Sequence, residues 1–467
     1  MRYKIISFLL LVLLFQTSCK KYLDINVSPN SPIATSERDL LPGIEAETAF
    51  NVAGGMPARI AAMWTQQLAY NAEPPEWDAY KWQPSDANNT WSFSMYTSIL
   101  NNLRIMRETA TSRGNNHYLA IAEVLTAYNL GVATDLWGDI PYTEAFQGTS
   151  KLQPKYEKQE EIYNKLFALL DSAITHSGKA AGPNAPSGGA GGDLIYSGSM
   201  NQWRKFAYFL KARHYLRLTN APGRTPAAQA TLALQALTNA FSSRADNATF
   251  EFFDTPGSEN PWNQAETKWG TFVVSDYFIN SLQSKNDPRL PIYADEAVNT
   301  GEYTGKVNGS DPSVANDFSH IGSLFNSADA PVYLATYTEA LFIKAEATFY
   351  TSGAAAAKPI FLAAAKESMT SIGVDASAAD AYLTRYATFT DANALASIMY
   401  EKYVANYLSL ESFNDWRRTN IPVLSLVENA VTTTIPQRWP YPSSERTNNP
   451  QPEHAILITE NVWWDTK

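Results

Sequence analysis

The sequence predicts a mainly α-helical protein, built from tetratricopeptide-like helical hairpins in an α superhelix with long irregular ligand-binding loops. Two observations predict this class. Alanine- and tyrosine-rich amphipathic segments recur in adjacent pairs along the 467 residues, and loops longer than a compact solenoid needs separate the pairs. Recurring helix pairs bury their apolar faces by stacking, as tetratricopeptide repeats do. Long loops in such a frame are commonly functional.

The clearest helix is expected over residues 117–135. Tyr118, Ile121 and Leu125 recur on one face at helical spacing, and small residues such as Ala127 and Gly131 form a stripe that permits close helix packing. Helical hairpins are expected from 117–135 with 158–176, 203–219 with 226–241, and 333–350 with 358–372. Further helices are expected over 37–51, 56–71, 91–112, 272–283 and 391–413.

Proline and glycine mark the irregular segments. Residues 73–89 contain three prolines among Asp, Asn and Ser, which prevents a regular helix, yet they carry three large aromatic rings. Residues 246–270 are also irregular and aromatic, and 294–330 read as a long loop. Residues 178–192 form a flexible Gly/Ala/Pro/Ser insert without the spacing of a phosphate-binding loop.

The N-terminus has the form of an export signal. Arg2 and Lys4 precede an apolar run over 5–15 that is too short to span a bilayer. Cys19 is the only cysteine and follows small residues, as at a bacterial lipoprotein cleavage site, although Gln16 replaces the expected leucine. We therefore expect a signal peptide over 1–18, a lipidated tether over 19–36 and one helical domain over 37–467. The alternative is an ordinary signal peptide with an incidental cysteine.

Charge and composition exclude several classes of function. Without residues 1–18 the chain has 34 basic and 46 acidic residues, which argues against binding to nucleic acid or to anionic lipid. The five histidines form no metalloprotease motif, and neither a serine-hydrolase elbow nor an EF-hand loop is present. We expect no enzymatic activity, no cofactor and no metal site; calcium held by scattered loop oxygens is left open.

Six stretches, in order, resemble the SusD/RagB family of Bacteroidetes nutrient-binding lipoproteins. Within them, Ser197 replaces a usual glycine and Tyr208 a usual asparagine. The stretches are CKKYLD (19–24), WGDIPY (137–142), 193–218, DPR (287–289), EALFIKAEA (339–347), and WRRT (416–419) followed by PQRWPYP (436–442) and Glu445. The resemblance implies a fold of four tetratricopeptide-like helix pairs. It also implies a surface-exposed outer-membrane lipoprotein that caps a SusC-like TonB-dependent transporter.

Most residues of these motifs are expected to be structural. Arg213 and Arg217 share a helix face at i, i+4, where like charges repel, so we expect them to meet carboxylates of a neighbouring helix. Glu339 and Glu346 could supply such partners. Asp139 could cap backbone amides, and Trp416, Arg417 and Arg418 could lock the C-terminal tail onto the helices.

The aromatic loops are the better candidates for ligand contact. An exposed flat ring can cover the apolar face of a sugar, and amide or carboxylate groups beside it can bond hydroxyls; the alternative is that these rings pack inside the protein. The candidate ligand-binding residues are Trp77, Tyr80, Trp82, Asn71, Asp78, Trp262 and Trp269.

The leading hypothesis is therefore non-catalytic capture of a nutrient, an oligosaccharide, for delivery to the transporter. A second hypothesis keeps the fold and changes the ligand to a peptide or another nutrient. A surface hydrolase and a plain tetratricopeptide scaffold are the remaining alternatives. The aromatic loops favour sugar over the scaffold, and the missing motifs disfavour the hydrolase.

Overall fold

Helices dominate the structure, a computed structural model that describes residues 35–72, 77–187, 192–450 and 456–466. The predicted signal peptide, Cys19 and the tether up to residue 34 lie outside the described residues, as does the side chain of Trp269. The elements are α2 (Glu37–Glu47), α3 (Met56–Trp64), β1 (Leu68–Tyr70), α4 (Asn101–Arg113), α5 (Asn116–Trp137), α6 (Gln159–Ser177), α7 (Met200–Arg217), α8 (Pro226–Leu237), β2 (Ala248–Phe250), α9 (Pro261–Trp269), β3 (Phe272–Val274), α10 (Asp276–Gln283), α11 (Leu290–Tyr293), α12 (Ser323–Asn326), β4 (Val332–Ala335), α13 (Tyr337–Thr370), α14 (Ala376–Leu383), α15 (Ala394–Ala405), α16 (Leu410–Thr419) and α17 (Ser443–Asn448), with π-helical segments η2 (Thr48–Ala53) and η3 (Asn89–Leu100).

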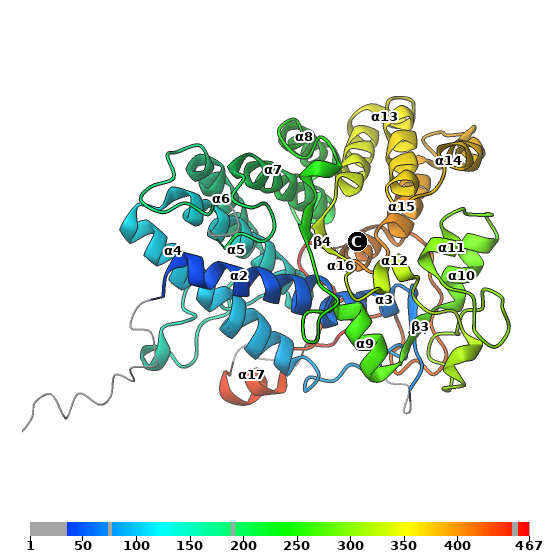
Figure 1. The fold of residues 1–467 in the computed structure, drawn as a ribbon, viewed down its shortest axis with the longest axis horizontal. Helices are drawn as coiled ribbons and strands as arrows, with labels where there is room; N and C mark the ends of the chain where they lie inside the picture. Colours follow the sequence, from blue (N-terminus) through cyan, green and yellow to red (C-terminus); the bar gives the residue numbers. More distant parts are fainter. Residues whose placement is uncertain (1–34, 73–76, 188–191, 451–455, 467) are drawn as a thin grey trace, which may run out of the picture.

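The helices stack in one continuous series, which confirms the predicted tetratricopeptide-like class. Each of α4, α5, α6, α7, α8, α13 and α15 contacts the next in that order, and the series crosses the molecule from α4 to α15 (Figure 1). The hairpins α5–α6 and α7–α8 lie where the periodicity predicts them. The third predicted hairpin is α13, which Gly353 divides because its φ of 77° breaks the helical backbone.

Helix α5 forms the centre of the stack. It is long and apolar enough to cross a membrane by composition, but it is buried inside the protein along that length. Its small-residue stripe has the predicted use. A Cβ atom on Gly131 would lie 2.9 Å from Cε1 of His214 on α7, so a larger residue there would have to displace the buried His214 ring.

Short strands replace the sequence expectation where two antiparallel strand pairs form. The helix predicted over 56–71 ends at Trp64, because Leu68–Tyr70 pairs antiparallel with Phe272–Val274. Residues 246–270, expected to be irregular, contain β2 and α9, and β2 pairs with β4 just before α13. Each pairing joins segments more than 80 residues apart, so local periodicity could not reveal it. The helix predicted over 391–413 is also divided, into α15 and α16.

The C-terminal tail folds back onto the end of α5. The Trp439 amide donates to the Leu136 carbonyl at 2.8 Å, and the Trp137 indole donates to the Pro440 carbonyl at 3.1 Å. The Tyr441 hydroxyl donates to the Asp139 carbonyl at 2.6 Å. These contacts bring the aromatic residues of the tail beside those of residues 77–96, where the candidate ligand residues lie.

Candidate functional site

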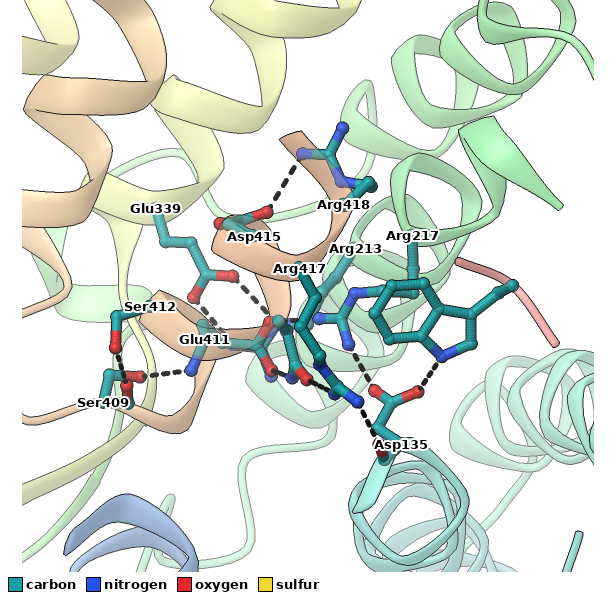
Figure 2. Close-up of polar contacts among 12 residues, drawn as sticks. Asp135, Arg213, Arg217, Glu339, Ser409, Glu411, Ser412, Asp415, Arg417 and Arg418 are labelled. Atoms are coloured by element: carbon teal, nitrogen blue, oxygen red, sulfur yellow. Dashed lines mark hydrogen bonds and ion pairs between the residues drawn. The ribbon is translucent and has the colours of Figure 1, made fainter. Parts of the chain in front are cut away.

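A buried network of arginines and carboxylates joins α5, α7, α13 and α16 (Figure 2). The Arg213 guanidinium donates to both Glu339 oxygens at 2.9 and 2.7 Å, and Arg217 bridges Asp135 and Glu411. The expected pairing of both arginines with carboxylates of neighbouring helices is therefore confirmed. Glu339 is one of the predicted partners. All of these groups are buried and paired with one another, so the network holds helices together.

Of the two arginines that follow Trp416, Arg417 has the expected role of holding the C-terminal tail. Arg417 donates to the backbone carbonyls of Asp135 at 2.8 Å and Gln437 at 2.7 Å, which fastens the tail to α5 and α16. Arg418 differs from the expectation: it pairs with Asp415 and with Glu346 on α13, the carboxylate expected to meet Arg213 or Arg217, so it joins α16 to α13 and not to the tail.

The predicted capping role of Asp139 is also confirmed. Its Oδ1 accepts from the Gln159 amide at 2.9 Å at the start of α6. The charged residues of these motifs therefore stabilise the fold. The aromatic loops remain the candidates for the ligand site.

Two of the three rings in the segment 77–89 are buried. Tyr80 is fully inaccessible and Trp82 is 3% exposed. The Trp82 ring lies 5.7 Å from Trp77 and 4.9 Å from Trp439, measured between ring centroids. The expectation that the rings of this loop face a ligand together therefore needs correction. The returning tail covers Trp82, so Tyr80 and Trp82 offer no surface on which a sugar could stack.

Asp78 also points into the protein and anchors the loop. Its Oδ2 accepts from the Tyr70 amide at 3.0 Å and the Gly309 amide at 2.9 Å. Burial raises the pKa of Asp78, although these two amides and the nearby Lys306 oppose that shift. Asp78 is fully buried, so it offers nothing to the hydroxyls of a bound sugar; it ties three loops into one unit.

Trp77 is the ring of this loop that reaches the surface. It is half-buried and packs against the half-buried Tyr70, with ring centroids 4.8 Å apart and planes inclined by 39°. We call Tyr70 and Trp77 the aromatic shelf. Asn71 lies at its edge, where its amide group exchanges hydrogen bonds with the backbone of Ser313 at 2.9 and 3.0 Å. The shelf thus combines two partly exposed rings with an adjacent amide.

Trp262 lies behind the shelf. It is 4% exposed, and the Arg59 guanidinium lies 5.8 Å from its ring and 5.9 Å from that of Phe272. Because Phe272 also contacts Tyr70 at 5.8 Å, the two predicted aromatic groups belong to one continuous packing unit. Trp262 lines a cavity of about 400 Å³ with Tyr333, but it is too buried to form a stacking surface. The backbone of Trp269 ends α9.

Sequence reasoning missed Tyr70, because it assigned this residue to a helix. The alternating pattern of a three-residue strand is too short to detect, and its partner β3 lies some 200 residues later. Among the residues that the structure describes, no group of three His, Cys, Asp or Glu is placed to hold a metal ion.

A family model and the solved structures that resemble this chain point to the same family. The model of the SusD-like family, described as starch-binding and associating with the outer membrane, matches residues 29–442. A SusD/RagB family protein from Bacteroides thetaiotaomicron superposes with a TM-score of 0.80 at 25% identity, covering 92% of this chain and 99% of that one.

Two further solved structures share the fold. One, named a chitin-binding protein, has a TM-score of 0.79 at 22% identity, with 92% of this chain and 100% of that chain covered. The other, a chitin-binding SusD homolog from Flavobacterium johnsoniae, has a TM-score of 0.70 at 21% identity, with 90% and 97% covered. No curated protein matches this chain.

Proposed function

This chain belongs to the SusD-like family of starch-binding proteins associated with the outer membrane, and from that premise we propose that it captures an oligosaccharide at the cell surface. It binds this nutrient without chemical change and passes it to a SusC-like TonB-dependent transporter. Two similar structures carry names that state chitin binding, which favours a carbohydrate ligand. Oligosaccharides derived from starch and from chitin are therefore the first ligands to test.

The aromatic shelf is the observation that carries this proposal. Tyr70 and Trp77 are half-buried, and each is backed by further rings, since Phe272 supports Tyr70 and Trp82 supports Trp77. Such backing fixes their orientation before a ligand arrives, which reduces the entropy lost on binding. A sugar face that covers about 60 Å² of one ring gains about 1.5 kcal/mol. The shelf is thus suited to bind a sugar weakly and reversibly, as delivery to a transporter requires.

The membrane anchor is proposed from the N-terminus. Cys19 would carry acyl chains after removal of residues 1–18, and more than one chain makes attachment to the outer membrane stable. A protein held there can remain beside its transporter while it exchanges ligand. Mild detergent extraction of native membranes should recover the two proteins together, and repeated recovery of free monomer would contradict the partnership.

Two tryptophan variants test the shelf. Trp77→Ala should weaken oligosaccharide binding by about 1.5 kcal/mol, roughly tenfold, with a small effect on the melting temperature because the ring is partly exposed. Trp82→Ala should instead lower the free energy of unfolding by about 3–5 kcal/mol, because it leaves a cavity in the core. Calorimetric titration and thermal melting of both proteins separate these effects.

Tyr333→Ala is the matched control for the loss of a surface ring. Tyr333 is 46% exposed on β4 and does not belong to the shelf. Binding should therefore be unchanged in this variant. The shelf assignment fails if Trp77→Ala binds each active oligosaccharide as tightly as wild type does, or if Tyr333→Ala weakens binding equally.

A further inference from the structure

A second cavity lies at the α4–α6 end of the helix stack. It has a volume of about 540 Å³, and α4, α5, α6 and the loop after α5 form its walls. Figure 1 shows these helices at the end of the molecule opposite α14. We call it the α4–α6 cavity. Its lining includes Arg104, Arg107, Glu123, Tyr142, Phe146 and Lys165. A volume of this size is typical of small-molecule sites.

Arg107 carries the unbalanced charge in this cavity. Its Nη1 donates to the Tyr142 hydroxyl at 3.2 Å, and its buried Nε has no hydrogen-bond partner. In the described part of the chain, no carboxylate forms an ion pair with it. The Arg107 side chain is half-buried and keeps this arrangement in a chain of net charge −10, which has an excess of acids.

The other charges of the cavity have partners. Arg104 pairs with Glu108 at 2.7 Å, and Lys165 lies 3.3 Å from Glu157. Glu123, the carboxylate in the lining, accepts from Ser172 at 2.7 Å and lies 2.8 Å from the His176 ring nitrogen. The remaining hydrogen-bonding capacity is therefore that of the Arg107 guanidinium, a cation whose planar N–H groups suit a carboxylate.

We propose that the α4–α6 cavity binds an acidic saccharide, with a uronate carboxylate on Arg107 and the sugar ring against Tyr142 and Phe146. Both aromatic side chains are half-buried and line the same cavity, so they can cover the apolar face of a sugar beside the guanidinium. The site is separate from the aromatic shelf, and its existence does not rest on sugar binding there. A peptide with a free C-terminal carboxylate is the competing occupant, which the experiment distinguishes.

The test uses the folded chain and a matched pair of ligands, trigalacturonate and its fully methyl-esterified form. The ester keeps the sugar rings and removes the charges, so it should bind at least tenfold more weakly by calorimetry. Arg107→Gln should reduce trigalacturonate affinity at least tenfold. Raising the salt concentration should weaken wild-type binding, because the contact is ionic. Lys165→Gln removes a second positive charge from the cavity lining. Because Lys165 is already paired with Glu157, this variant should reduce the affinity for trigalacturonate only two- to fivefold.

One control variant should bind trigalacturonate as wild type does, and a second variant distinguishes the cavity from the shelf. Arg385→Gln makes the same charge change in the turn η8 (Thr384–Tyr386), which follows α14 at the other end of the molecule. Trp77→Ala removes the shelf and keeps the cavity, so a loss confined to this variant would place the acidic sugar on the shelf and overturn the proposal. Equal binding of acid and ester, or no effect of Arg107→Gln, would also overturn it. Arg107-dependent binding of an acetylated tripeptide without binding of trigalacturonate would refute the saccharide assignment.

Discussion

Replacing Arg217 by methionine should lower the free energy of unfolding by about 3–5 kcal/mol, because the change leaves two buried carboxylates without their shared cation. The Arg217 side chain is 2% exposed and bridges Asp135 on α5 to Glu411 on α16 (Figure 2). After the substitution, Asp135 keeps the Trp464 indole at 2.8 Å, and Glu411 keeps Arg213 at 3.7 Å. Neither contact replaces the lost double ion pair.

The effect should depend on pH. Burial raises the pKa of Asp135 and Arg217 lowers it, so the pKa rises further in the variant. A carboxyl group whose pKa is higher in the folded state takes up a proton on folding. Its stabilising contribution is complete below the unfolded value, near 3.9, and is lost as the pH rises through the folded value. The deficit of Arg217→Met should therefore be smaller at pH 5 than at pH 8.

Urea unfolding at both pH values measures the deficit, and Arg224→Met is the control. Arg224 is exposed and lies 3.8 Å from Glu160, a surface pair whose loss should change stability by less than about 1 kcal/mol. The reasoning is refuted if Arg217→Met costs under about 1 kcal/mol with an unchanged urea dependence. It is also refuted if the deficit is equal at the two pH values.

Two further predictions concern other parts of the chain. Burial and the neighbouring Asp193 carboxylate raise the pKa of Glu45 well above its usual value, so the contribution of Glu45 to stability should fall as the pH rises from about 4.3 through that pKa. Glu45→Gln, which mimics the protonated form, should be about 1–3 kcal/mol more stable than wild type at pH 8 and similar at pH 4; equal stability at pH 8 would contradict this. Cys19→Ala should fold normally but lose acyl label and outer-membrane fractionation, and an unlabelled wild type would refute the lipid anchor.

The sequence alone determined where the main helices lie and predicted some of the ion pairs that join them. Helical periodicity is local, so α5, α6, α7 and α8 could be placed by it within a few residues. Like charges at i, i+4 on an apolar helix need acids from elsewhere, which anticipated the pairing of Arg213 and Arg217. Proline in residues 73–89 excluded a regular helix, and residues 77–80 and 84–87 indeed form turns.

Tertiary structure decided which rings and charges face outward. A proline-rich aromatic loop is compatible with exposed or buried rings, and only the returning tail, through Trp439, covers Trp82 and leaves Trp77 at the surface. Tyr70 lies beside Trp77 because β1 pairs with β3, which follows some 200 residues later in the sequence. The unpaired state of Arg107 likewise depends on where every nearby acid lies. Which ring stays exposed, and which acid pairs with which base, depend on contacts between residues distant in sequence, so local patterns do not identify them.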